Sequence, residues 1–308
     1  MSQELTSSSP FISRFFAWSN ERFPAANIIS GALSYTTMVS VGKHVAGLSL
    51  SLTWLDLLGA LAFTAHLLLL RIFDEHKDYA VDKINHPERA LSKGLITLQH
   101  LKFIALPLPL LAIIWSVYTD NGIGTVSYLW IIMFTYSALM AKEFFIGEWL
   151  VKRLVLYSFS HMIVSPMMIL WIIAGGMKTL YMTETIWIMM ILAFTGGIAY
   201  ELTRKTRGTD EDTNLDAYNK HFGVKGSIGI ITLMNLISFI SALQVLLTIR
   251  EDVSVIAYIV LVLGYTCTFY PTINFIKKQT EKARKINEGG IGLFFLGLYA
   301  SLLYALFI

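Results

Sequence analysis

The sequence predicts an all-α integral membrane protein, a bundle of nine transmembrane helices in which cytoplasmic loops cap a central cavity. Its composition is the first reason. Hydrophobic residues make up 55% of the 308 residues and charged residues only 15%, and the mean hydropathy is +0.60, which is too apolar for a soluble globular protein of this length. The second reason is that apolar segments of about 20 residues, the length of a spanning helix, recur along the whole chain.

Nine such segments can be marked. They lie at residues 28–48, 52–73, 101–118, 125–141, 154–175, 184–201, 227–249, 253–275 and 289–308. Because they fill the chain, we expect one membrane domain over residues 1–308. The first ten residues are polar and lack the basic start and apolar core of a secretory signal. The aromatic and basic residues of 11–27 predict an interfacial helix, so we expect residues 1–27 to form a polar, interfacial N-terminal segment.

The basic residues predict the orientation of the bundle. Lysine and arginine in short loops stay on the cytoplasmic side, and alternate loops here hold 21 of the 24 basic residues, leaving Lys43, Lys178 and Arg250 on the other side. We therefore expect a multi-pass protein of the cell membrane with a cytoplasmic N-terminus and the C-terminus opposite. The single cysteine, Cys267, excludes an intramolecular disulfide and a cysteine-rich zinc site.

A row of carboxylates follows the second apolar segment. Asp74, Asp78 and Asp82 are spaced four apart, which aligns them along one face if the helix continues, and Glu75 lies beside them. Like charges at this spacing destabilise a bare helix by roughly 0.2–0.5 kcal/mol per pair. A bound Mg²⁺ would explain the row, because Mg²⁺ prefers carboxylate and phosphate oxygens. The alternative is a solvated helix end whose acids pair with neighbouring lysines.

The segment HPERALSKGLIT comes next, where a bend and the cations Arg89 and Lys93 could hold phosphate oxygens over the acidic row. With this segment the sequence resembles the UbiA superfamily of intramembrane prenyltransferases. That family usually has NDxxDxxxD followed by a segment like RPLxSG, and here the stretches are DEHKDYAVD, from Asp74 to Asp82, and RALSKG, from Arg89 to Gly94. Nine spans with acidic loops after spans 2 and 6 complete the resemblance.

The second acidic motif of the family, typically DxxxD at the end of span 6, is altered in this chain. Glu201 falls at its first position and Lys205 at its second. Either Lys205 contacts a diphosphate directly, or an acid of the following loop completes a second metal site. The loop acids are Asp210, Glu211, Asp212 and Asp216. We favour Glu201 and Asp212 as ligands, which gives a predicted metal-binding set of Asp74, Glu75, Asp78, Asp82, Glu201 and Asp212.

The resemblance implies Mg²⁺-dependent ionisation of an isoprenyl or polyprenyl diphosphate. Cations would stabilise the departing pyrophosphate, and a dry bundle interior would shelter the carbocation. The candidate cations are Arg89, Lys93, Lys142, Arg153, Arg204 and Lys205. The candidate substrate-binding residues are His66, Tyr157, His161 and Tyr200. A role in packing, or in a hydrogen bond that ties two helices, is the alternative for each of these four.

We therefore expect an enzyme that transfers a prenyl group within the membrane to a small acceptor, which is most often aromatic in relatives. An intramembrane terpene cyclase of the same superfamily is the alternative enzyme. A transporter is disfavoured, because its acids should lie near the bilayer midplane and here they cluster at one membrane face. The expected partners are the isoprenyl diphosphate, the acceptor and the lipid bilayer, without nucleic acid or an obligate protein partner.

Overall fold

The structure is a computed structural model of the chain and describes residues 5–177, 179–210 and 217–308. These residues fold into helices without a β-strand in the described ranges. The helices are α1 Phe11–Arg22, α2 Ala25–Val45, α3 Trp54–Asn85, α4 Leu98–Ala105, α5 Leu108–Asp120, α6 Thr125–Ala141, the 3-10 turn η1 Glu143–Phe145, α7 Gly147–Val151, α8 Leu154–Met162, α9 Val164–Gly176, α10 Glu184–Lys205, α11 Tyr218–Ile249, α12 Val255–Thr266, α13 Phe269–Lys278 and α14 Glu281–Phe307.

Three of the long apolar segments are broken into two helices, and proline explains each break. A proline inside a helix removes one backbone hydrogen bond and collides with the carbonyl four residues earlier. The break between α4 and α5 falls at Pro107, that between α8 and α9 lies three residues before Pro166, and that between α12 and α13 lies just before Pro271. Each pair still runs on as one candidate span.

Seven helices of the described chain are long and apolar enough to cross a membrane, so this is a multi-pass membrane protein. The other two predicted spans coincide with α2, which has 21 residues, and α6, which has 17. The count of nine spans and their orientation in the bilayer stay predictions.

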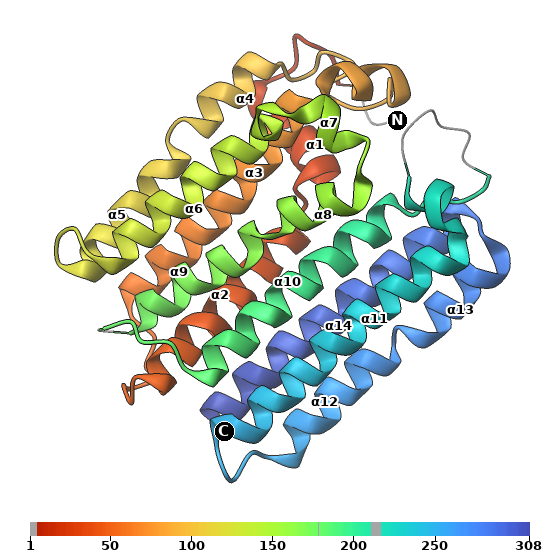
Figure 1. Cartoon of the computed structure of the whole chain (residues 1–308). Coiled ribbons are helices and arrows are strands. Elements are labelled where there is room, and N and C mark those ends of the chain that lie inside the picture. The colour runs from red at the N-terminus through yellow and green to blue at the C-terminus, as the bar shows by residue number, and fades with distance from the viewer. Residues whose placement is uncertain (1–4, 178, 211–216) are drawn as a thin grey trace.

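The long helices lie side by side along a common direction (Figure 1). The first half of the chain packs α3 against α2 and α5, and the second half packs α10 against α11 and α12 against α14. The halves meet where α2 packs on α9 and α14. The contact of α2 with α9 is backbone to backbone, since a Cβ added to Gly42 would lie 2.3 Å from the carbonyl oxygen of Ile173.

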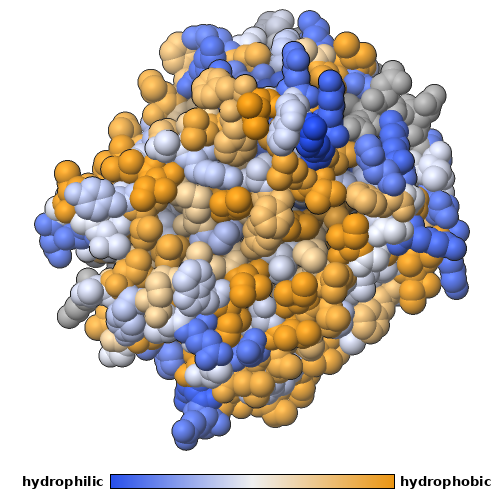
Figure 2. Space-filling view, viewed as in Figure 1, coloured by the Kyte–Doolittle hydropathy of each residue, from blue (hydrophilic) through white to orange (hydrophobic). Residues whose placement is uncertain are grey.

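One end of the bundle gathers α1, α4 and α7, while the C-terminus of α14 lies at the other (Figure 1). The surface follows the same division, with an apolar middle and hydrophilic residues collected toward the ends of the helices (Figure 2). We call the end that contains the last turns of α3 and α10 the charged end. The acidic row of α3 and the altered motif of α10 lie there.

Candidate functional site

The acidic row lies at the C-terminal end of α3, in the part of the helix that exceeds the thickness of a bilayer core. With 32 residues, α3 is roughly 48 Å long, against the ~30 Å of a hydrocarbon core. The apolar part of the helix ends at Leu70, and the charged residues begin at Arg71. The predicted continuation of the helix past Arg71 is therefore observed.

The four carboxylates of the acidic row do not all lie on the same face of α3. An α-helix turns about 100° per residue, so each step of four residues drifts by about 40°. Asp78 is therefore displaced by about 40° from Asp74, and Asp82 by about 80°, which leaves Asp82 only about 20° from Glu75. The four acids divide into two pairs, Asp74 with Asp78 and Glu75 with Asp82.

Glu75 is buried, with 2% of its surface exposed, and both oxygens of its carboxylate are engaged. Oε1 accepts hydrogen bonds from Arg22 of α1 and from Arg71, the latter at 2.9 Å. Oε2 accepts one from the indole of Trp18 at 3.4 Å. These contacts leave Glu75 little capacity to bind the metal for which the sequence proposed it, and they make it an anchor for α1.

Asp82 belongs to the same contact region. Its Oδ2 accepts hydrogen bonds from Arg22, at 3.4 Å, and from Arg89. Helix α1 also binds the segment after α3, because Glu21 accepts a hydrogen bond from the backbone of Ala90 at 2.9 Å. Of the two cations predicted in this segment, Arg89 therefore reaches the acidic row.

The bend predicted in RALSKG is present, with Gly94 in the left-handed region at φ +74°. Lys93, just before it, is exposed. The bend lets the chain reverse between α3 and α4 and brings Leu91 and Ile96 into a small core around Trp18. The segment is thus fixed by α1 and by apolar packing.

The other pair of acids is less engaged. Asp74 lies 3.8 Å from Arg71 and 3.7 Å from Lys77, both long for ion pairs. The half-buried carboxylate of Asp78 forms no ion pair or hydrogen bond with another described residue. The charges of Lys77 and Lys205 act on it. Asp74 and Asp78 are therefore the carboxylates of the row that can accept a new ligand.

A hydrogen-bonded cluster adjoins this pair through Lys77, which lies 3.7 Å from Asp74. Lys77 donates to the hydroxyl of Tyr157 at 2.9 Å, and that hydroxyl donates to Oε1 of Glu143 at 3.1 Å. Oε2 of Glu143 lies 3.2 Å from Nε2 of His161. The ring of Tyr157 stacks on His161 at 3.9 Å between centroids, and the ammonium of Lys205 lies 4.5 Å from the same ring. Two predicted substrate-binding residues, Tyr157 and His161, thus lie at the centre of the charged end.

Glu143 and Lys77 are functional candidates that the sequence interpretation did not include. Glu143 is carried by a turn in which it, Phe144 and Phe145 all have left-handed backbone angles, at φ 50°, 53° and 60°. Such angles are costly for residues with side chains. Burial favours the neutral acid, but the adjacent His161 and the Lys77 ammonium hold the pKa of Glu143 at about 2. Glu143 is therefore a fixed anion of the cluster.

The end of α10 carries the altered second motif. Glu201 is buried, and its Oε1 lies 2.7 Å from the ammonium of Lys205 while its Oε2 accepts a hydrogen bond from Arg204 at 3.0 Å. The charge of Asp74 acts on Arg204, as that of Asp78 does on Lys205. The cations of α10 therefore interact electrostatically with these two acids of α3.

The loop acids divide between described and undescribed residues. Asp212, with Glu211 and Asp216, lies outside the described residues, so its predicted role as a ligand stays a prediction. Asp210 accepts a hydrogen bond from the backbone of Glu281 at 2.7 Å and so ties the loop to the start of α14.

The side chains of the remaining predicted residues form no hydrogen bond or ion pair with Lys77, Tyr157, Glu143 or His161 in the described part of the chain. Lys142 is exposed, and Arg153 stacks on Trp149 at 4.1 Å, beside an open groove of about 690 Å³. Tyr200 is 45% exposed. His66 is fully buried deeper in the bundle, 3.4 Å from the hydroxyl of Ser137.

The residues present can be compared with what Mg²⁺ requires. Among the described residues, no three His, Cys, Asp or Glu side chains are placed to hold a metal. Mg²⁺ bound together with a phosphate needs only one or two carboxylates. Asp74 and Asp78 meet that requirement. Glu201 does not, because both of its oxygens already bind cations.

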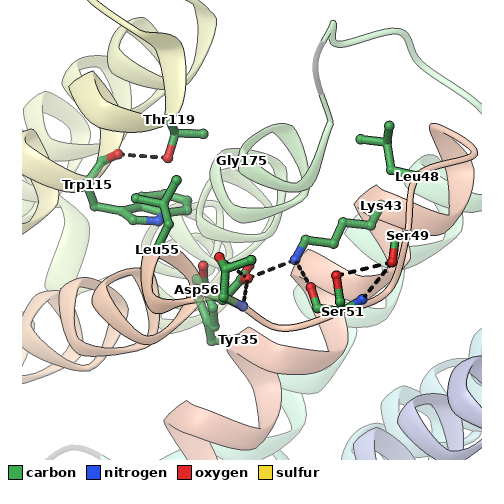
Figure 3. Close-up of a pocket in the computed structure, with 11 residues that line it drawn as sticks. Tyr35, Lys43, Leu48, Ser49, Ser51, Leu55, Asp56, Trp115, Thr119 and Gly175 are labelled. Atoms are coloured by element: carbon green, nitrogen blue, oxygen red, sulfur yellow. Dashed lines mark hydrogen bonds and ion pairs between the residues drawn. The ribbon is translucent and has the colours of Figure 1, made fainter.

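A separate cavity of about 220 Å³ lies at the opposite end of the bundle, near Trp115 and Gly175 (Figure 3). Its polar wall is the ion pair of Lys43 with Asp56, at 2.8 Å. Asp56 also accepts hydrogen bonds from Thr53, where it caps the first turn of α3. These charges fix the end of a helix, and the acids of α3 lie at the other end of that helix.

Comparison with solved structures identifies the fold. A digeranylgeranylglyceryl phosphate synthase matches with a TM-score of 0.63 over 96% of this chain and 98% of its own, at 13% sequence identity. An apo UbiA homologue from Aeropyrum pernix K1 matches with a TM-score of 0.64 over 87% of this chain and 97% of its own, at 12% identity. The chain therefore has the fold of this UbiA homologue.

The resemblance read from the acidic row is thus confirmed for the UbiA fold, over nearly the full length of both solved proteins. No family model and no curated protein matches the sequence. The chain therefore shares its fold with these two structures at only 13% and 12% sequence identity.

Proposed function

We propose that this UbiA-like protein is a prenyltransferase that uses Mg²⁺ to transfer an isoprenyl group from a diphosphate to an acceptor within the membrane. The observation that carries the proposal is geometric: Asp74 lies 3.7 Å from Lys77, and the ammonium groups of Lys77 and Lys205 lie 5.5 Å and 4.5 Å from the centre of one aromatic ring, at one end of an apolar bundle. Carboxylates that are weakly paired or unpaired, beside a group of cations, suit a phosphate that arrives with a divalent metal. The fold shared with a UbiA homologue supports the same function.

The roles of the residues follow from where charge develops. Asp74 and Asp78 would hold Mg²⁺, which when bound supplies positive charge to the diphosphate oxygens. Lys77, Arg204 and Lys205 would bind the remaining phosphate oxygens and stabilise the leaving group. The C–O bond of the allylic ester breaks, both electrons leave with pyrophosphate, and the carbocation forms a new bond with the acceptor, which loses a proton.

The bundle interior would protect the cation from water. The ring of Tyr157 stacks on His161 at 3.9 Å and lies 4.5 Å from the ammonium of Lys205, so aromatic rings adjoin the proposed phosphate site. Aromatic faces attract positive charge, and a dry cavity prevents capture of the cation by water. We assign Tyr157 and His161 to the wall that the first isoprene unit contacts.

The acceptor is proposed by class. Aromatic acceptors are commonest in the superfamily that the acidic row resembles, whereas the name of one structural neighbour, a digeranylgeranylglyceryl phosphate synthase, refers to a glyceryl phosphate product. Both classes are small enough to reach a site at the membrane surface. A terpene cyclase, which needs no acceptor, is the alternative.

Product analysis tests the proposal. Purified protein in lipid nanodiscs should be incubated with Mg²⁺ and labelled isoprenyl diphosphates of several lengths, with and without aromatic acids and glyceryl phosphates. We expect a prenylated acceptor, detected by mass spectrometry, and its loss when Mg²⁺ is chelated. A cyclised hydrocarbon formed without any acceptor would favour the cyclase, and an unchanged diphosphate under all conditions would contradict both enzymes.

A further inference from the structure

We propose that Arg204 and Lys205 form a metal-free subsite for a phosphate group, so that the diphosphate is held by Mg²⁺ on the α3 side only. This inference rests on the proposed function and gives it a specific form. It predicts one divalent ion per active site, where an acidic motif at the end of α10 would have predicted a second.

The state of Glu201 is the first argument. Glu201 is 7% exposed, and the two oxygens of its carboxylate lie 2.7 Å from Lys205 and 3.0 Å from Arg204. A metal at this carboxylate would have to displace two cations that lie one turn away on the same helix and already bind both of its oxygens. Glu201 therefore orients the two cations and does not offer a ligand.

Charge balance is the second argument. A lysine in place of the second carboxylate of DxxxD changes the local charge by two elementary charges, from negative to positive. One Mg²⁺ contributes the same two charges. The substitution at Lys205 thus removes a metal ligand and supplies the positive charge that the lost metal would have provided.

Geometry is the third argument. The ammonium groups of Lys205 and Lys77 lie 4.5 Å and 5.5 Å from the centre of the same Tyr157 ring, so they come from α10 and α3 to one place. Lys77 also lies 3.7 Å from Asp74, which joins this place to the acids of α3. A phosphate bound between the helices would meet cations from both.

Donor capacity is the fourth argument. A guanidinium has five N–H donors and an ammonium has three. Nε of Arg204 is buried without a hydrogen-bond partner among the described residues, while another nitrogen of the same group holds Glu201. Arg204 can therefore bind a phosphate oxygen without releasing the carboxylate that orients it.

The test uses binding and does not depend on turnover. Purified protein in nanodiscs is titrated with inorganic pyrophosphate by calorimetry, in EDTA and in Mg²⁺. We expect binding in EDTA that weakens about tenfold in each of Arg204→Gln and Lys205→Gln, the loss of one charged hydrogen-bond donor. Lys285→Gln, which removes an exposed cation of α14 near the same end, is the matched control and should bind as the wild type does.

A metal count completes the test. Electron paramagnetic resonance of bound Mn²⁺ with pyrophosphate should give one ion per chain in the wild type. Two ions per chain, or pyrophosphate binding in EDTA that neither variant weakens, would overturn the inference while leaving the proposed function intact. A wild-type protein that binds pyrophosphate neither in EDTA nor with a metal would instead contradict the proposed function. Tryptophan fluorescence during heating verifies that each variant is folded.

Discussion

Glu143 allows the electrostatic interpretation of the charged end to be tested by its effect on stability. Replacement by Gln keeps the shape of the side chain and removes the anion that faces Lys77 and His161 at 3.2 Å each. A pKa that falls from 4.5 to about 2 on folding corresponds to about 3 kcal/mol of stability at neutral pH. Glu143 is only 16% exposed, so screening by water reduces this value little.

The sign of the pH dependence follows from the direction of the shift. Because the pKa of Glu143 is lower in the folded state, its contribution is complete above the unfolded value of 4.5 and disappears as the pH falls toward about 2. Roughly half of it remains at pH 3. The stability gap between wild type and Glu143→Gln should therefore be about 3 kcal/mol at pH 7 and roughly half that at pH 3.

Thermal or denaturant unfolding in detergent, followed by tryptophan fluorescence, measures this gap. Glu148→Gln is the matched control, since Glu148 is an exposed acid of neighbouring α7, and it should change stability little at either pH. A gap that is absent at pH 7, or equally large at pH 7 and pH 3, would refute the assignment of Glu143 as a fixed anion.

Two further predictions concern the scaffold. Arg22→Ala removes the cation that joins α1 to Glu75. We expect the free energy of unfolding to fall by about 2 kcal/mol, less than for a fully broken buried pair, because Glu75 keeps a second arginine. Faster proteolysis of the N-terminal segment would show this loss, and unchanged proteolysis would contradict it. Gly176→Ala places a Cβ 2.3 Å from the carbonyl oxygen of Val39 and should cost about 1–3 kcal/mol of stability. The matched variant Gly229→Ala, at a helical position with open space, should be neutral or slightly stabilising, and equal behaviour of the two glycines would contradict the close packing of α2 on α9.

The acidic row shows how far the sequence predicts this site. The spacing of Asp74, Asp78 and Asp82 indicated a helix end rich in acids, and α3 has that form. The division of the row was missed, because the drift of about 40° per step turns Asp82 toward Glu75. Arg22 of α1, which binds both Asp82 and Glu75, lies more than fifty residues away in the sequence, and no local sequence pattern predicts this contact.

Glu143 was missed for a different reason. Its position depends on three successive left-handed residues, and none of Glu143, Phe144 and Phe145 is a glycine that would signal such a turn. The exposed Lys142 beside it was the more obvious candidate. The sequence shows that the loop is charged, but the direction in which the Glu143 side chain points depends on its contacts with Lys77 and His161.

The second motif was the part of the site for which the sequence left two alternatives. Lys205 at the position of an expected carboxylate suggested either direct contact with a diphosphate or a ligand from the following loop. The ion pairs that Glu201 forms with Arg204 and Lys205 support the first alternative. They could not be foreseen from spacing alone, because residues three and four apart on a helix are neighbours whether or not they pair.

The most direct test of the central claim is the release of pyrophosphate from an isoprenyl diphosphate by purified wild type and by Asp78→Asn, measured against Mg²⁺ concentration. Asp252→Asn, which changes an exposed acid near the opposite end of the bundle, is the control. If Asp78 holds Mg²⁺ against the diphosphate, Asp78→Asn should lose activity by on the order of a hundredfold or more, while the control retains it. Full Mg²⁺-dependent activity in Asp78→Asn would contradict the account.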